Sequence, residues 1–274
     1  MKKSNIFVKN KQFTIFLILA LVVVGIAIFA PYIAPMDPYE TVMTESLQEP
    51  GDKYICGTDK LGRDVLSRVI FGTRTSLTMT LCLVAVIFII GTTLGIIAGF
   101  FGGMIDQVIM RIADMMISFP GMVLAIAIAG MLGPNVVYAV IAIAAVSWTK
   151  YARLARSMVL KIRKNLYIEA AVITGTKKIN IILKYVVPNM ITTVIVTAAT
   201  DIGSMMLELA GLSFLGFGAT APTPEWGLML HEGRANISKA PWRMIYPGIA
   251  IMIVVIIFNM LGDSIRDMMD TRQE

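Results

Sequence analysis

The chain has 274 residues, of which 57% are hydrophobic and only 15% are charged, whereas a soluble globular domain has about 25% charged residues. This composition excludes an ordinary soluble enzyme and predicts an integral membrane protein. The formal net charge is +6, but the basic residues flank apolar segments, so they predict membrane topology and no binding to nucleic acid.

Six apolar segments predict an all-α integral membrane protein with about six transmembrane helices. They occupy residues 12–34, 76–100, 108–132, 135–152, 188–212 and 244–262. The first follows a basic N-terminus, as in a secretory signal, but it is long and no small-residue cleavage site follows it. We therefore expect an uncleaved first span.

The third and fourth segments are joined by residues that interrupt helices. Pro120-Gly121 predicts a kink or break inside the third span, because proline removes a backbone hydrogen bond. Gly133-Pro134-Asn135 predicts a tight turn between the two spans. The third span also contains Arg111 and Asp114, whose i,i+3 spacing predicts an internal ion pair.

The distribution of charge predicts the orientation in the membrane. Residues 149–187 are rich in lysine and arginine and contain Glu169 as their only acid, whereas residues 35–75 are mixed in charge. The positive-inside rule therefore places residues 149–187 in the cytoplasm and residues 35–75 outside. With six spans, both termini are expected in the cytoplasm.

Cysteine and histidine are too scarce for a metal centre of the usual kind. Cys56 lies in a polar loop and Cys82 in an apolar span, so both are expected to be free thiols. The single histidine, His231, excludes a multi-histidine site within this chain, and we expect it to be exposed or hydrogen-bonded.

Acidic residues within the fifth span are candidates for the translocation path. Asp201 and Glu208 are seven residues apart and hence on roughly one helix face, with Met205 and Met206 between them. One interpretation is a polar, sulfur-lined strip along the path. The other is an interhelical hydrogen bond for each acid and plain packing for each methionine, and the sequence leaves both open.

The cytoplasmic segment predicts two short helices that meet at Gly175, a residue that permits a sharp turn. The second helix has an apolar stripe formed by Ile179, Ile182, Leu183 and Val186. Pro188 suits the first turn of the following span. Helices this short need support from a partner groove or from the lipid surface, and both remain open.

This segment resembles the EAA loop of bacterial ABC-importer permeases through Glu169-Ala170-Ala171, Gly175 and the sequence that ends in Pro188-Asn189. The resemblance implies that the loop, residues 167–189, docks into an ATP-binding subunit. Its docking residues would be Glu169, Ala170, Ala171, Gly175 and Pro188.

A second motif, residues 57–64, resembles the GTDxLGRD signature of the dipeptide, oligopeptide and nickel permeases. Its signature positions are Gly57, Asp59, Gly62, Arg63 and Asp64. The resemblance covers nearly everything after residue 30 and implies the type I importer architecture and a "C"-type permease subunit. It divides the chain into residues 1–75, an N-terminal span with the external motif, and residues 76–274, the core permease domain.

The resemblance also implies the partners of the chain. They are a second, "B"-type permease chain, two ATP-binding subunits, an extracytoplasmic solute-binding protein and the lipid of the bacterial inner membrane. The sequence contains no phosphate-binding loop, so this chain is not expected to be an enzyme or to bind a cofactor, and ATP and Mg²⁺ belong to the partner subunits.

The expected cargo is nickel or a chelated metal, with a di- or oligopeptide as the alternative. The segments around Asp201 and around Ala221 look closer to the nickel branch, and thioether and carboxylate groups suit a metal or its chelate. Two other classes are a secondary transporter that relays protons through Asp201 and Glu208, which usually shows internal repeats, and a membrane scaffold or sensor.

Overall fold

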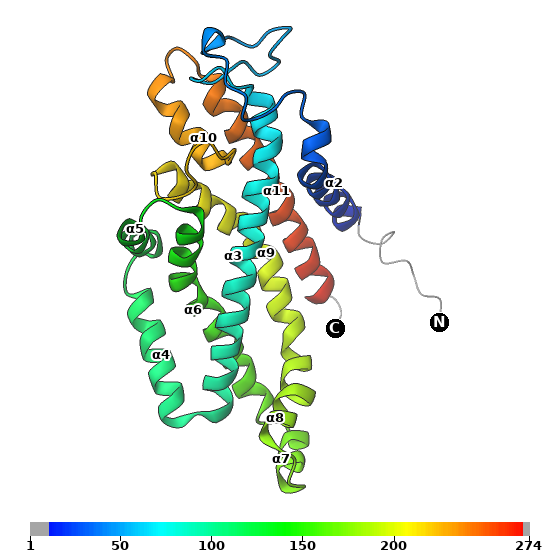
Figure 1. The fold of residues 1–274 in the computed structure, drawn as a ribbon. Helices are drawn as coiled ribbons and strands as arrows, with labels where there is room; N and C mark the ends of the chain where they lie inside the picture. The colour runs from blue at the N-terminus through cyan, green and yellow to red at the C-terminus, as the bar shows by residue number, and fades with distance from the viewer. Residues whose placement is uncertain (1–10, 271–274) are drawn as a thin grey trace.

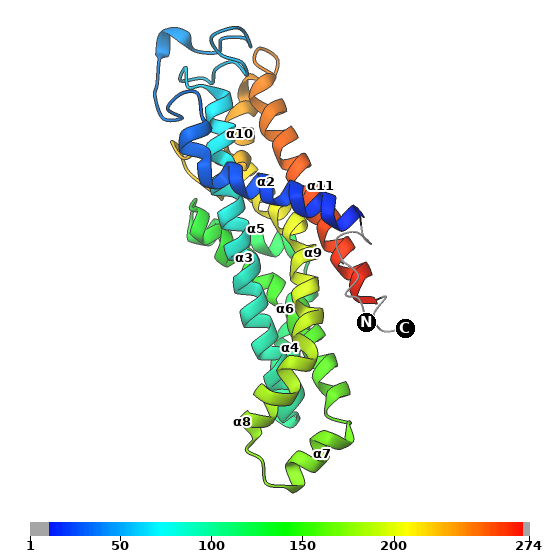
Figure 2. The same ribbon diagram turned by 90° about the vertical axis from the view of Figure 1, so that its right-hand side faces the viewer.

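A computed structural model describes residues 11–270, and this part of the chain is helical without a named strand. The elements are α2 (Lys11–Ile33), η1 (Met43–Glu45), α3 (Val65–Phe101), α4 (Gly103–Ile117), α5 (Gly121–Leu132), α6 (Val136–Ile162), α7 (Leu166–Ile173), α8 (Lys178–Ile181), η2 (Ile182–Val186), α9 (Val187–Phe214), α10 (Trp226–Gly233), η3 (Arg234–Asn236) and α11 (Trp242–Asp270). The prediction of an all-α protein is confirmed. The molecule is elongated, with α7 and α8 at one end and α10 and the loop before α3 at the other (Figures 1 and 2).

Within residues 11–270, four helices are long and apolar enough to cross a membrane: Lys11–Ile33, Val65–Phe101, Lys178–Phe214 and Trp242–Met269. The bent pair formed by α4 and α5 makes a fifth if it is taken as one span. Helix α6 has 27 residues, but its second half carries basic side chains that lower its hydropathy. The number of six spans and the cytoplasmic position of both termini therefore stay predictions.

The break predicted at Pro120 is present and is sharp. Helices α4 and α5 meet at an angle of 93°. Helix α4 ends where the Ser118 hydroxyl donates to the Asp114 carbonyl at 2.8 Å, and Pro120 precedes α5. Because proline has no N–H to continue the ladder of α4, the chain turns at this point.

Helices α3 and α6 pack closely through a glycine stripe on α3. A Cβ atom added at Gly91 would lie 2.4 Å from the Trp148 carbonyl oxygen, and one added at Gly95 would lie 2.3 Å from the Ala152 carbonyl oxygen. One more turn along, a Cβ atom added at Gly99 would lie 2.9 Å from the Val159 Cβ and 3.0 Å from the Arg156 carbonyl oxygen. Small residues at every fourth position let two helix backbones approach, which is a common packing mode in membranes.

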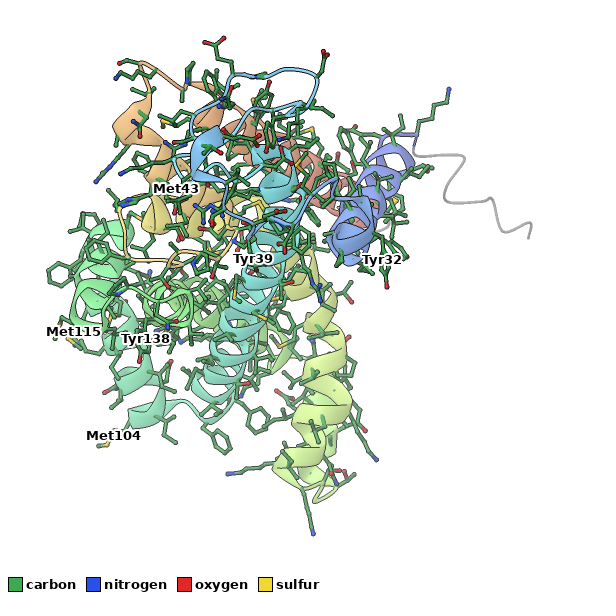
Figure 3. All side chains as sticks on the ribbon, turned by 45° about the horizontal axis from the view of Figure 1, so that its top comes forward. Tyr32, Tyr39, Met43, Met104, Met115 and Tyr138 are labelled. Carbon is green, nitrogen blue, oxygen red and sulfur yellow. The ribbon has the colours of Figure 1, made fainter. Side chains whose placement is uncertain are left out.

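Two large apolar clusters hold the helices together. The first joins α3, α5, α6 and α9 and extends into α7 and α8, with Tyr151 and Met190 fully buried. The second joins α2, α3, α9, α10 and α11 around Trp226. The outer surface is apolar as well, and Figure 3 shows Met104 and Met115 pointing outward from α4, where they are 80% and 51% exposed. Such a surface suits lipid or a membrane partner.

Candidate translocation and coupling sites

The cytoplasmic loop predicted from the sequence forms a helical hairpin at one end of the molecule (Figures 1 and 2). Helices α7 and α8 are separated by a turn in which Gly175 has a φ of +75°, a conformation that glycine adopts without strain. Pro188 lies in the first turn of α9, as predicted. The two short helices and their break are thus confirmed.

The hairpin has an inner and an outer face. Ile168 and Ala171 of α7 are buried and belong to the first apolar cluster. On the other side, Leu166 is 82% exposed and Ile173 is 85% exposed, and Glu169 lies exposed between them in sequence. The hairpin therefore presents an apolar surface with one acid in it, while its inner face anchors it to the span helices.

Of the residues that the resemblance assigns to docking, the larger part lies on the outside. Glu169, Ala170, Gly175 and Pro188 are exposed, whereas Ala171 is buried against the first cluster. Ala171 is therefore placed to hold the hairpin to the spans, while the other four are accessible to a partner.

The apolar stripe predicted for the second helix is wrong in part. Ile182 and Val186 are buried, but Ile179 and Leu183 are 56% and 58% exposed, and Ile181 takes a buried place. The cause is the π-helical turn η2 over Ile182–Val186, which widens the helix and shifts its register.

Asp201 lies at the centre of a second candidate site, between α6 and α9. Its carboxylate accepts a hydrogen bond from the Lys150 ammonium at 2.6 Å and another from the Tyr151 hydroxyl at 2.9 Å. Asp201 is buried, whereas the Lys150 side chain is 61% exposed. The ion pair therefore lies at the edge of the helix packing, with the lysine reaching in from the surface.

A hollow of about 260 Å³ lies beside this ion pair. Asp201, Ser204, Met205 and Glu208 of α9 all line it, together with Lys150 of α6. The structure thus brings Asp201 and Glu208 to one cavity, as their seven-residue spacing predicts. Asp201 makes the interhelical hydrogen bonds of one interpretation and also faces a cavity, and its part in a translocation path stays a prediction.

Met206 does not line this hollow. It is only 2% exposed and packs in the second apolar cluster with Trp226 and Phe258. Adjacent residues on an α-helix point about 100° apart, so Met205 faces the hollow while Met206 faces the core. Of the two predicted methionines, Met205 therefore lies at the hollow and Met206 lies in the core.

A larger hollow, of about 360 Å³, lies on the other side of Lys150. It is lined by Thr193, Thr197 and Thr200 of α9 and by Arg266 of α11, again with Lys150. In the sequence, Lys150 is one of the basic residues that predict the membrane topology. Its position inside the predicted span 135–152 is also a signal for a functional role.

The ion pair predicted between Arg111 and Asp114 is wrong. Asp114 pairs with Arg153 of α6 at 2.5 Å, and Asp106 of α4 pairs with Arg156 of α6 at 2.5 and 2.6 Å. The acids of α4 thus find cations on the neighbouring helix, because the two helices run side by side. Arg111 is exposed on another face of α4.

The motif at residues 57–64 forms a compact turn at the end of the molecule opposite the α7–α8 hairpin (Figure 1). The Asp59 carboxylate accepts from the backbone N–H groups of Leu61 and Arg63 at 2.8 and 3.0 Å and from the Arg63 side chain at 2.6 Å. Asp64 accepts from the Ser67 backbone N–H and caps α3. Carboxylates here close the loop and begin the helix.

The glycines and Arg63 of the motif, together with Arg68, join this turn to its surroundings at this end of the molecule. Gly57 and Gly62 have φ values of +72° and +74°, and a Cβ atom at Gly62 would lie 1.9 Å from the Val42 carbonyl oxygen. Arg63 and Arg68 both reach the Glu232 carboxylate, at 3.2 and 3.3 Å. The motif is thus part of the packed structure at this end of the molecule.

His231 and the cysteines behave as the sequence predicts. A ring nitrogen of His231 is 2.7 Å from the Phe214 carbonyl oxygen, so this side chain is hydrogen-bonded. Cys56 and Cys82 are free thiols. Within residues 11–270 no group of three or more histidine, cysteine, aspartate or glutamate side chains could hold a metal ion.

Comparison with known proteins gives the chain its relatives. The family described as "Binding-protein-dependent transport system inner membrane component" matches residues 91–274, and "N-terminal TM domain of oligopeptide transport permease C" matches residues 5–50. The dipeptide transport system permease protein DppC of Alkalihalophilus pseudofirmus is 44% identical over 97% of this chain and 88% of its own length. The nickel transport system permease protein NikC of Escherichia coli is 38% identical over 92% of each chain.

The fold is also similar to a solved structure. The methionine ABC transporter MetNI in an inward-facing conformation contains a chain that matches with a TM-score of 0.58 and 18% identity, over 73% of this chain and 95% of that one. At this identity the likeness concerns the fold alone, and it is the fold of a type I importer permease.

Proposed function

Since the chain belongs to the family of binding-protein-dependent transport system inner membrane components and is thus a permease subunit of an ABC importer, we propose that its cargo is a di- or oligopeptide. As a permease it is not itself an enzyme, and ATP is hydrolysed by partner subunits. Membership of this family also sets aside the proton-coupled secondary transporter and the scaffold or sensor.

The cargo proposal rests on one observation above the others. The relative that shares 44% identity over nearly the whole chain is named as a dipeptide permease, and the nickel permease shares 38%. The comparisons thus favour the peptide alternative over the nickel or chelated metal expected from the sequence.

The charges around the candidate path support the same cargo. The smaller hollow is lined by two acids, Asp201 and Glu208, against one cation, Lys150, whereas the larger hollow is lined by Lys150 and Arg266 and by no acid. A peptide with free termini carries an ammonium and a carboxylate, so it matches both hollows, whereas a bare cation matches only the first.

The hairpin of α7 and α8 is the proposed contact with an ATP-binding subunit. Its exposed apolar residues, Leu166 and Ile173, are the kind of side chain that fills a groove of a partner, and Glu169 adds a charge for orientation. Its buried residues, Ile168 and Ala171, would carry a displacement of the hairpin into the first apolar cluster and hence into α6 and α9.

The remaining partners follow from the same proposal. A second permease chain would complete the path, as membership of this permease family implies. A solute-binding protein would deliver the peptide at the external end, where the 57–64 motif and α10 lie (Figure 1). The complex would lie in the inner membrane of a bacterium.

Uptake by intact cells tests the cargo. Cells with and without this gene are given a radiolabelled dipeptide and, separately, radiolabelled nickel, each with and without an excess of the other solute unlabelled. We expect dipeptide uptake to depend on the gene and to be unaffected by nickel. Gene-dependent nickel uptake that ignores dipeptide would show that the proposed cargo is wrong.

A further inference from the structure

The two hollows adjoin one ion pair, and α6 and α9 line both of them, together with α3 at the smaller hollow and α11 at the larger one. Every α9 residue that lines the smaller hollow comes from residues 201–208, and every α9 residue that lines the larger one comes from residues 193–200. Lys150 lines both. Since α9 rises from the hairpin end toward the external end, the smaller hollow is the outer one and the larger hollow is the inner one (Figures 1 and 2).

The ion pair stands at the boundary between the two hollows, since Asp201 lines the smaller one and Lys150 lines both. The Lys150 side chain crosses from α6 to α9 and meets the Asp201 carboxylate at 2.6 Å. Tyr151, which is fully buried, holds the other carboxylate oxygen at 2.9 Å and fixes its orientation. The lysine is the mobile partner, because its side chain is 61% exposed while that of Asp201 is 7% exposed.

Separating Lys150 from Asp201 costs free energy, and the cost depends on which charged group takes the place of the lysine. Withdrawal of Lys150 leaves a buried carboxylate without a cation, and an uncompensated buried charge is strongly unfavourable. A solute that carries its own cation removes that cost. A solute that also carries an anion occupies the freed ammonium, so a zwitterion is the chemical class that exchanges with both partners.

We infer that Lys150 and Asp201 form a gate between the outer and inner hollows, which a zwitterionic peptide opens by pairing its ammonium with Asp201 and its carboxylate with Lys150. Glu208 draws the ammonium into the outer hollow, and Arg266 receives the carboxylate in the inner one. The inference rests on the proposed peptide cargo and adds to it the residue, Lys150, that links recognition to passage.

The accessibility of a thiol in the outer hollow measures how well the pair of Lys150 and Asp201 separates the two hollows. Ser204 is exposed and lines the outer hollow, so it is replaced by cysteine in a chain that also carries Cys56→Ser and Cys82→Ser. The complete complex in inverted membrane vesicles without nucleotide is treated with a neutral, membrane-impermeant maleimide, which reaches this cysteine only from the inner side. A neutral reagent keeps its reaction rate independent of the charges that are changed.

We expect slow labelling in this parent and about tenfold faster labelling after Lys150→Met, which corresponds to about 1.4 kcal/mol of lost barrier. Methionine keeps the length of the side chain but neither its charge nor its donors. Lys150→Arg keeps the pair and should label slowly, as should the control Lys161→Met, an exposed lysine of α6 that lines neither hollow. Equal rates in the parent and Lys150→Met, or fast labelling in the parent, would overturn the gate.

The kinetics of dipeptide uptake measure whether the peptide exchanges with the partners of the ion pair. With the binding protein present, Lys150→Met should lower the maximal rate of dipeptide uptake about tenfold and leave the half-saturating concentration unchanged, since capture occurs on the binding protein. Lys161→Met should change neither value. An unchanged maximal rate in Lys150→Met would overturn the role of the pair in passage.

The two experiments separate the gate from the cargo. If the unmodified complex takes up no dipeptide at all, the proposed cargo is wrong, and the maleimide result still decides whether Lys150 and Asp201 close the passage. If dipeptide is taken up and labelling does not respond to Lys150→Met, the cargo stands and the gate is wrong.

Discussion

Gly95 of α3 lies so close to Ala152 of α6 that a methyl group on the glycine would be 2.3 Å from the carbonyl oxygen of Ala152. The nearest atom belongs to the backbone of α6, so a change of side-chain rotamer cannot relieve the clash. The distance between α3 and α6 is therefore limited by the hydrogen atom that stands in place of a side chain at position 95.

Gly95→Ala is expected to destabilise the protein. The added methyl group forces α3 and α6 apart, and overpacking of this kind costs about 1–3 kcal/mol. The thermal midpoint in detergent or nanodiscs, followed by tryptophan fluorescence, should fall by several degrees. Gly25→Ala in α2 is the matched control, since a Cβ atom there has no neighbour within 4 Å and should leave the midpoint unchanged or raise it.

Glu169→Lys is expected to block transport while the protein still inserts and assembles. Glu169 is exposed on the hairpin, so the substitution leaves the core intact and reverses the charge of the proposed contact with the ATP-binding subunit. Uptake should fall at least about tenfold, since a disfavoured charge at an interface costs 1.4 kcal/mol or more.

The control for this change is Glu49→Lys, which alters the net charge equally at an exposed site outside the hairpin. Both variants should reach the membrane in equal amounts, as judged by immunoblotting of membrane fractions. Normal uptake in Glu169→Lys would contradict a coupling role for this residue.

The ion pair between Asp106 and Arg156 should contribute to the packing of α4 on α6. Their side chains are 16% and 34% exposed, and two hydrogen bonds join them. Because solvent screens the pair in part, a double-mutant cycle with Asp106→Asn and Arg156→Met should give a coupling of about 1 kcal/mol. A cycle with Asp106→Asn and Arg111→Met should give none, whereas equal coupling energies in the two cycles would contradict this arrangement.

Stability should depend on pH through Glu225. This carboxylate is buried, caps α10 by accepting from the backbone N–H groups of Gly227 and Leu228 at 2.8 Å each, and also accepts from the Ser76 hydroxyl. Burial raises the pKa of Glu225 above its ordinary value of 4.5, although these hydrogen bonds act in the opposite direction. The folded state therefore holds the proton more tightly than the unfolded state does.

The raised pKa of Glu225 determines how the stability of the protein changes with pH. The contribution of Glu225 is fully present below its ordinary pKa of 4.5 and is lost as the pH rises through the higher pKa of the folded state. Between about pH 4 and pH 7, the thermal midpoint should fall more in the parent than in Glu225→Gln. Glu40→Gln, at an exposed carboxylate, should follow the parent, and identical pH profiles for Glu225→Gln and the parent would show that burial does not control this group.

Much of the local structure could be predicted from the sequence because it depends on neighbours along the chain. Pro120 ends one helix, Gly175 separates the two short helices and Pro188 begins the long one. The EAA and 57–64 motifs indicate the family, since their residues stand at fixed spacings. The glycines at positions 91, 95 and 99 were a further signal, because small residues four apart predict close helix packing in a membrane.

The tertiary structure alone decided which side chains meet. Asp114 pairs with Arg153 of another helix instead of Arg111 three residues away, because the crossing of α4 and α6 brings the more distant arginine nearer. Because of the rotation of α9, Met205 faces a hollow and Met206 faces the core. The π-turn before α9 changes the helix register, and Ile179 and Leu183 point outward. Helix rotation and crossing depend on contacts among residues far apart in the chain, so the pair of Lys150 with Asp201 was decided only when α6 and α9 packed together.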